Sequence, residues 1–345
     1  MAPARKPRGG DAWAELPREE LLDLRIRDLG VRLEGTWVEE CIEELYGELE
    51  GRELVLRPHC WLSSEWFSPS GIPGIGIPFY LAHPRLMRLE RSMMLEVEGG
   101  TRADCLRILR HETGHAIQHG YNLHRRRMWR ELFGSSATPY PDSYRPNPAS
   151  HNYVQHLRLY YAQSHPDEDF AETFAVWLGP RATWQRRYEG WRALDKLQYV
   201  DALMAEIAGV RPTRLTRTRI EPVSEITTTL RAHYEAKRAQ YAVDFPTTYD
   251  RELRKVFSDA PNHAGRELAS AFIQRHRTEI RRTVARWTGE YEFALDQLLR
   301  DMIGRCRELK LRVGGPQRQV LLDFAGMLAV STVHFLYSRR MSIAV

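Results

Sequence analysis

The stretch from Cys105 to Tyr121 constrains the chain more than any other, because His111, Glu112 and His115 form an H-E-x-x-H pattern. On a helix, His111 and His115 project in nearly the same direction one turn apart, so two imidazoles can share one tetrahedral ion. Glu112 then lies beside the metal, where a carboxylate can act as general base on a zinc-bound water. The pattern predicts a catalytic zinc site. The alternative is an ordinary amphipathic helix with solvated His and Glu.

A second informative stretch runs from residue 160 to residue 180, with Pro166 suited to a first helical turn. Glu168 and Glu172 are one turn apart and share a face with Ala171 and Ala175. Like charges at this spacing repel, so the arrangement is favourable when a cation and its imidazole ligands lie opposite. We therefore predict Glu168 as the third ligand of a single zinc ion, with water in the fourth position, and Glu172 as the acceptor of a proton from a ligating imidazole.

Other interpretations of the same residues remain open. An acidic first helical turn is favoured by the helix dipole, which accounts for 167–169 but leaves Glu172 unexplained. His124 and His165 could replace Glu168 as ligands, and His119 is expected in solvent or beside the ligands. A metzincin site is excluded, because that pattern requires glycine and histidine where the chain has Gln118 and Tyr121.

The two motifs together resemble those of the gluzincin clan of metallopeptidases. The segment His165-Pro-Asp-Glu-Asp-Phe-Ala-Glu-Thr-Phe-Ala is most similar to the bacterial family of putative zinc-binding metallopeptidases and, in outline, to the catalytic domain of anthrax lethal factor. The resemblance covers roughly residues 50–180 and implies Glu168 as the ligand, with Glu172 supporting the site. It also implies that Tyr161 stabilises the oxyanion of the tetrahedral intermediate. Tyr160 is adjacent, and the register leaves both tyrosines open.

The remaining sequence indicates a mostly helical α+β protein with a small sheet. Helical spacing is expected at 17–29, 37–50 and 84–98, and short strands at 53–63 and 75–82. We predict a flexible basic tail at 1–10, a zincin-like metallopeptidase domain at 11–210, a linker at 211–223 and an all-α accessory domain at 224–345. The proline-rich segment 134–149 is expected to be a loop, either a lid or substrate rim or an idle surface loop.

Composition favours a cytoplasmic protein. The four cysteines are scattered singly, which predicts reduced thiols, and no apolar run follows the basic start of the chain. The apolar segment from Val320 to Tyr337 contains Asp323 and His334, so we expect a buried helix rather than a membrane span.

A positive helical stretch is expected in the C-terminal third. A solvated face is the favoured interpretation, and nucleic acid or an acidic protein is the alternative partner. Its members are Arg275, Arg277, Arg281, Arg282 and Arg286.

These features predict a hydrolase, a zinc-dependent protease acting on a peptide or protein substrate. A zinc-activated water would be the nucleophile, with Glu112 as general base. The alternative is a non-catalytic regulatory protein that uses a metallopeptidase fold to bind nucleic acid or protein.

Overall fold

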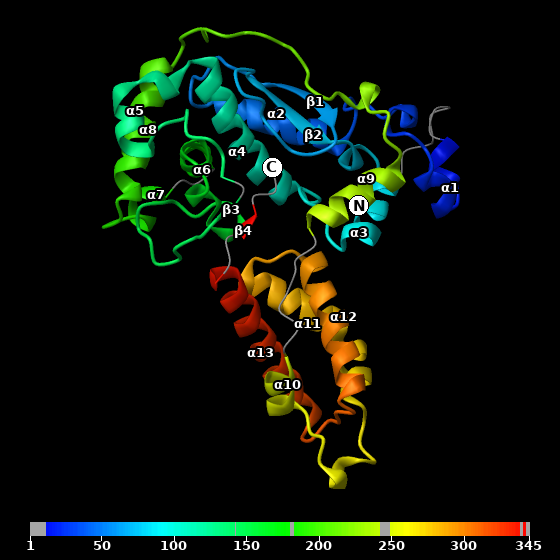
Figure 1. Ribbon diagram of the computed structural model, residues 1–345. Coiled ribbons are helices and arrows are strands. Elements are labelled where there is room, and N and C mark those ends of the chain that lie inside the picture. Colours follow the sequence, from blue (N-terminus) through cyan, green and yellow to red (C-terminus); the bar gives the residue numbers. More distant parts are fainter. Residues whose placement is uncertain (1–11, 142, 180–182, 242–248, 339–340, 343–345) are drawn as a thin grey trace. The chain divides into compact units, whose positions relative to one another are not determined.

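The chain divides into two compact units in the computed structural model (Figure 1). The structure describes residues 12–141, 143–179, 183–241, 249–338 and 341–342, so the predicted tail at 1–10 lies outside the described residues. The first unit comprises the described residues up to Met93 and those from Val97 to Ala236. The second unit comprises Met94–Glu96 and the described residues from Lys237 onward.

The first unit is mostly helical. Its α-helices and strands, in chain order, are α1 (Arg18–Leu22), α2 (Trp37–Glu50), β1 (His59–Ser63), β2 (Gly74–Pro78), α3 (Pro84–Met94), α4 (Arg102–Gly120), α5 (Arg127–Phe133), β3 (Ser143–Tyr144), α6 (Pro166–Leu178), α7 (Trp184–Arg187), α8 (Ala193–Ile207) and α9 (Leu230–Gln240). Short 3-10 turns connect them at Ala12–Glu15, Ile26–Leu29, Phe79–Ala82, Leu123–Arg125, Arg158–Gln163 and Val223–Glu225.

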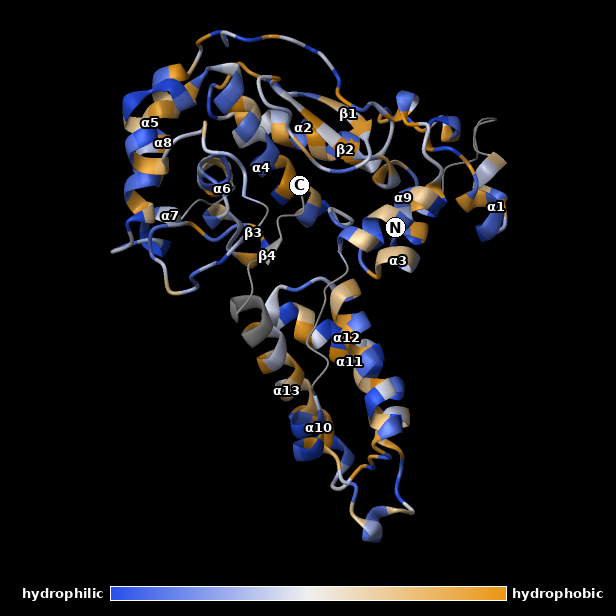
Figure 2. Ribbon diagram, in the orientation of Figure 1, coloured by the Kyte–Doolittle hydropathy of each residue, from blue (hydrophilic) through white to orange (hydrophobic). Residues whose placement is uncertain are grey.

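The two longer strands form a small parallel sheet, in register from His59 opposite Gly74 to Ser63 opposite Pro78. Both strands are shorter than the sequence predicts. The second ends at Pro78, which lacks an N–H for a sheet hydrogen bond and is followed by the 3-10 turn Phe79–Ala82. Hydrophobic residues gather on β1 and β2 in Figure 2, and every residue of β2 is buried. The predicted mostly helical α+β fold is confirmed.

Helix α4 carries the H-E-x-x-H pattern and is almost entirely buried from Cys105 to its end. It begins after Thr101, whose hydroxyl accepts a hydrogen bond from the backbone N–H of Asp104 and so satisfies one free donor of the first turn. The helix packs against α2, α6 and β2. This burial on several sides accounts for its weak amphipathic pattern and fixes the direction in which its histidines project.

Helices α4 and α6 approach each other most closely at Gly114 and Ala171. A Cβ atom added to Gly114 would lie 2.7 Å from Cα of Ala171 and 3.0 Å from its carbonyl oxygen. Only glycine fits opposite this backbone, so the small residues of the two helices set their separation.

We predict that Gly114→Ala lowers the free energy of unfolding of the first unit by about 1–3 kcal/mol, because the added methyl group must push α6 away. Thermal unfolding and zinc affinity should both show the change. The matched control is Gly47→Ala in α2, where an added Cβ meets no atom within 4 Å. The control should stabilise the helix by about 0.5–1 kcal/mol. Equal effects of the two substitutions would contradict the close packing.

The second unit contains α10 (Asp250–Val256), a 3-10 turn (Pro261–His263), α11 (Ala269–Thr288), α12 (Glu292–Glu308), α13 (Gln317–Ser338) and the short strand β4 (Met341–Ser342). Its apolar core is formed by the four helices and includes Leu253, Phe272, Leu299 and Phe324. Helix α13 includes the apolar segment that the sequence analysis predicts to be a buried helix, but only one face is buried: Phe324 and Leu328 are fully buried, whereas Val330 is 70% exposed. Among the described residues, no helix is long and apolar enough to cross a membrane.

The segment 211–223, predicted as a linker, is held on the first unit. The backbone N–H of Thr213 donates to the carbonyl of Gly120 at 2.9 Å, and the indole of Trp61 donates to the carbonyl of Ile220 at 2.8 Å. The hydroxyl of Ser63 donates to the carbonyl of Glu221 at 2.8 Å. The division between the units therefore falls near residue 236, inside α9, rather than within 211–223.

The predicted positive stretch lies on α11, and three of its five arginines form ion pairs within the second unit. Arg277 and Arg281 both contact the carboxylate of Asp296, which is 2% exposed, and Arg281 also reaches Glu292. Arg275 pairs with Glu267. The pairs with Asp296 and Glu292 join α11 to α12, and together with Arg275–Glu267 they neutralise much of the charge that an acidic partner would use.

Glu290 makes the stability of the second unit depend on pH. Burial raises the pKa of this carboxyl from 4.5 to about 7, so the folded state binds a proton more tightly than the unfolded state. Stability is therefore lost as the pH rises from about 4.5 to about 7.

We predict that Glu290→Gln raises the free energy of unfolding by about 2–3 kcal/mol at pH 8 and changes it little at pH 4. The amide oxygen can still accept the 2.8 Å hydrogen bond from the N–H of Tyr291. Urea unfolding of the full chain at the two pH values measures the difference. Equal effects at both values would rule out a titrating carboxyl.

Candidate metal centre

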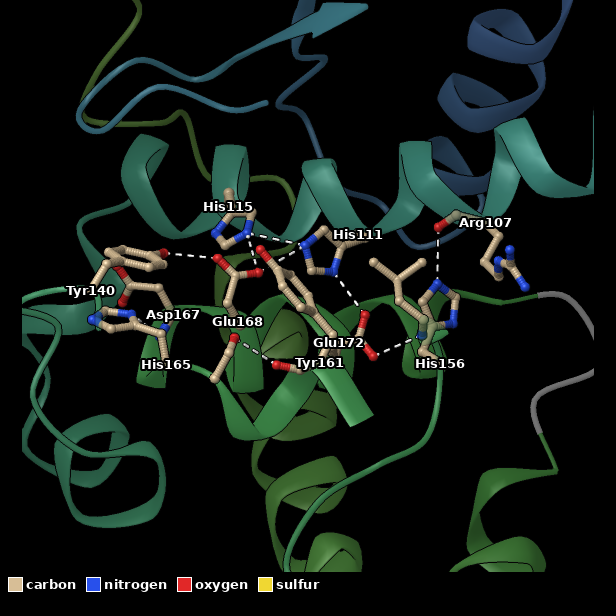
Figure 3. Close-up of polar contacts among 12 residues, drawn as sticks. Arg107, His111, His115, Tyr140, His156, Tyr161, His165, Asp167, Glu168 and Glu172 are labelled. Atoms are coloured by element: carbon tan, nitrogen blue, oxygen red, sulfur yellow. Dashed lines mark hydrogen bonds and ion pairs between the residues drawn. The ribbon is translucent and has the colours of Figure 1, made fainter. Parts of the chain in front are cut away.

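Three buried donor atoms from two helices converge on one point (Figure 3). Nε2 of His111 and Nε2 of His115, both on α4, lie 3.3 Å apart. Oε2 of Glu168, on α6, lies 3.0 Å from the first nitrogen and 3.2 Å from the second. The structure thus brings together the three residues that the sequence analysis predicts as ligands.

These distances fit a tetrahedral zinc ion. With zinc–ligand bonds of about 2.0–2.1 Å, two ligand atoms of a tetrahedron are about 3.3 Å apart. Nδ1 of His111 lies 2.9 Å from Oε1 of Glu172 and donates its proton to it, so Nε2 of His111 presents a lone pair to the oxygen of Glu168. Two facing lone pairs repel unless a cation or a proton lies between them. The donor set therefore suits zinc.

Glu172 connects His111 to the segment that carries Tyr161. Its Oε1 accepts from His111, and its Oε2 accepts a 2.9 Å hydrogen bond from the backbone N–H of Leu157. The following residues Leu159 and Tyr160 have φ of 60° and 58°, a left-handed conformation that is unusual for such side chains. This kink, fixed at its start by Glu172, leads directly into Tyr161.

Tyr161 faces the ligands. Its ring centroid lies 5.8 Å from that of His111, and Figure 3 shows its hydroxyl pointing toward the group formed by His111, His115 and Glu168. Burial, followed by the charge of Glu168, raises its pKa well above 10, so the hydroxyl keeps its proton. Among the described residues, none forms a hydrogen bond with this hydroxyl.

Glu112 is buried beside the ligands. Burial raises the pKa of its carboxyl above 4.5, while the nearby imidazoles of His111 and His115 act in the opposite direction. A carboxylate with a raised pKa is a stronger base than one in water, which is the property a general base needs.

The remaining candidate histidines lie outside the ligand group. His165 caps α6: its Nδ1 accepts from the N–H of Asp167 at 3.1 Å, and its Nε2 donates to the carbonyl of Thr138 at 2.7 Å. His119 is buried with its ring 5.9 Å from that of His124, and burial lowers its pKa to about 3, so it is neutral. Of the two positions expected for His119, in solvent or beside the ligands, the first is wrong, because the residue is 7% exposed.

Two residues of the site were missed by the sequence analysis. Tyr140 donates to Oε1 of Glu168 at 2.8 Å, and Nε2 of His156 donates to the carbonyl of Arg107 at 2.9 Å on α4. Both lie in segments without regular spacing. The position of the loop 134–149 between the two helices suggested a lid or substrate rim there. It did not single out Tyr140, and nothing in the sequence indicated His156.

Two imidazoles from an H-E-x-x-H helix and a carboxylate from a second helix are a donor set typical of catalytic zinc sites. Residues 101–208 match the model of the family described as putative zinc-binding metallo-peptidase. The match begins just before α4 and ends just after α8. It therefore includes His111, His115 and Glu168 and no residue of the second unit. No curated protein and no solved structure matches the chain.

We predict that Glu172→Gln weakens zinc binding by about 10–100-fold. One amide oxygen cannot accept from both His111 and Leu157, so one of the two donors loses its partner. Competition with a metal-binding indicator measures the affinity. The control is Glu189→Gln at an exposed position, which should bind zinc as the unmodified protein does. Unchanged affinity in Glu172→Gln would show that this carboxylate does not support the ligand.

Proposed function

We propose that this protein is a gluzincin-type peptidase that uses a single zinc ion to hydrolyse peptide bonds. The observation that supports this most directly is the convergence of His111, His115 and Glu168 on one point, with Glu112 buried next to it. Two nitrogen donors and one carboxylate leave a fourth position open, as catalytic rather than structural zinc sites do. Zinc bound there supplies Lewis-acid activation of the water and of the scissile carbonyl.

The protein's own side chains carry the protons. Glu112 takes a proton from the attacking water and passes it to the leaving amine, and its raised pKa suits both steps. Tyr161 donates its hydroxyl proton in a hydrogen bond to the oxygen of the tetrahedral intermediate, where negative charge develops. Tyr160 stands in the left-handed kink, so we assign this role to Tyr161.

The proposed catalytic domain lies in the first unit, which includes 211–223 and ends at Ala236, and the proposed helical accessory domain is the second unit from Lys237 onward. The cytoplasmic location stays a prediction from the sequence.

We expect Glu112→Gln to retain zinc and lose peptide hydrolysis by at least about 10²–10⁴-fold, because the amide cannot accept the proton of water. His115→Ala should lose zinc, since two donors hold the ion poorly. Metal content of the purified variants and cleavage of a peptide library measure the two properties separately. A Glu112→Gln protein that cleaves as well as the unmodified protein would refute the mechanism.

The alternative function is a non-catalytic protein that binds nucleic acid or another protein. It would be favoured by strongly salt-dependent DNA binding without any zinc-dependent cleavage. The ion pairs of Arg275, Arg277 and Arg281 within the second unit count against it, because they leave fewer positive charges for phosphates.

A further inference from the structure

The two oxygens of Glu168 have different partners. Oε2 faces both ligand imidazoles, at 3.0 Å and 3.2 Å, whereas Oε1 accepts the hydroxyl of Tyr140 at 2.8 Å (Figure 3). A carboxylate can bind a metal through one oxygen or through both. A hydrogen bond to Oε1 occupies one of its two lone pairs and lowers its electron donation, which favours metal binding through Oε2 alone.

Tyr140 is held in place by the same helical turn that carries Glu168. Its ring stacks on His165 with centroids 3.8 Å apart and an angle of 13° between the planes. His165 in turn donates to the carbonyl of Thr138 at 2.7 Å and caps α6 through Asp167. The position of the Tyr140 ring is therefore fixed relative to Glu168, even though this residue is 43% exposed.

A further contact ties the loop to α6. The hydroxyl of Ser136 donates to Oδ2 of Asp167 at 3.0 Å. Ser136, Thr138 and Tyr140 are alternate residues of one segment, and each meets the first turn of α6. The loop thus presents the Tyr140 hydroxyl to Glu168 with little freedom, so the hydrogen bond needs little further ordering.

We propose that Tyr140 is a positioning residue that restricts Glu168 to one metal-binding oxygen and so keeps the ion four-coordinate, with three protein donor atoms and water. The proposal rests on the proposed zinc site. Tyr140 acts through Glu168 alone, whereas the hydroxyl of Tyr161 has no hydrogen-bond partner among the described residues and faces the proposed position of the substrate. The two tyrosines therefore have different roles: Tyr140 orients a metal ligand, and Tyr161 contacts the reacting carbonyl.

The experiment compares Tyr140→Phe with the unmodified protein, each loaded with zinc for affinity and with cobalt for its visible absorption. In Tyr140→Phe we expect zinc affinity to fall about 10–100-fold. The cobalt absorption should weaken, because Glu168 then binds through both oxygens and coordination rises from four to five. Phenylalanine keeps the ring stacked on His165, so the fold should be preserved.

Two further variants make the outcome specific. Tyr121→Phe removes a hydroxyl that donates to the carbonyl of Val210 at 2.8 Å, and it should leave both affinity and spectrum unchanged. Tyr161→Phe should lower kcat while leaving the cobalt spectrum as it is. A Tyr140→Phe protein with a lower unfolding temperature but an unchanged spectrum would overturn the proposal. An unmodified protein that binds neither metal would overturn the zinc site itself.

Discussion

The close contact between α4 and α6 is the constraint on which the site depends. The ligands come from both helices, and their donor atoms lie about 3 Å apart only because the backbones approach at Gly114 and Ala171. The contact is also buried, so the carboxylates and imidazoles interact with little screening by water. A larger side chain at either position would separate the donors before it affected any residue of the site directly.

The first turn of α6 requires its own support, because it contains three acidic residues in succession. The helix dipole favours them, and each has a separate partner: Asp167 accepts from Ser136, Glu168 faces the imidazoles, and Asp169 meets the ammonium group of Lys196 on α8. Burial raises the pKa of Asp169 to about 7, which shows how costly its charge is even beside Lys196. The surrounding elements are arranged to separate these carboxylates.

The sequence was informative where spacing follows helical geometry. His111 and His115 are four residues apart and therefore project from the same side of one helix. The same spacing places Glu168 and Glu172 on one face of a second helix. Tyr140 and Leu157 could not be predicted, because the loops that carry them are shaped by contacts with residues far along the chain. The boundary near 211–223 was misplaced for a similar reason: a basic, threonine-rich run is typical of a linker, yet its carbonyls accept from Trp61 and Ser63.

The carboxylate of Glu172 has a thermodynamic consequence. One of its oxygens accepts from His111, and the other accepts from the backbone N–H of Leu157 at the start of the segment 157–161. The same carboxylate therefore holds both parts of the site. Binding equilibria that share an anchor are reciprocal: if zinc orders the segment 157–161, then ordering that segment must strengthen zinc binding by the same factor. At the proposed site, a substrate that orders this segment by contacting Tyr161 would therefore also strengthen zinc binding.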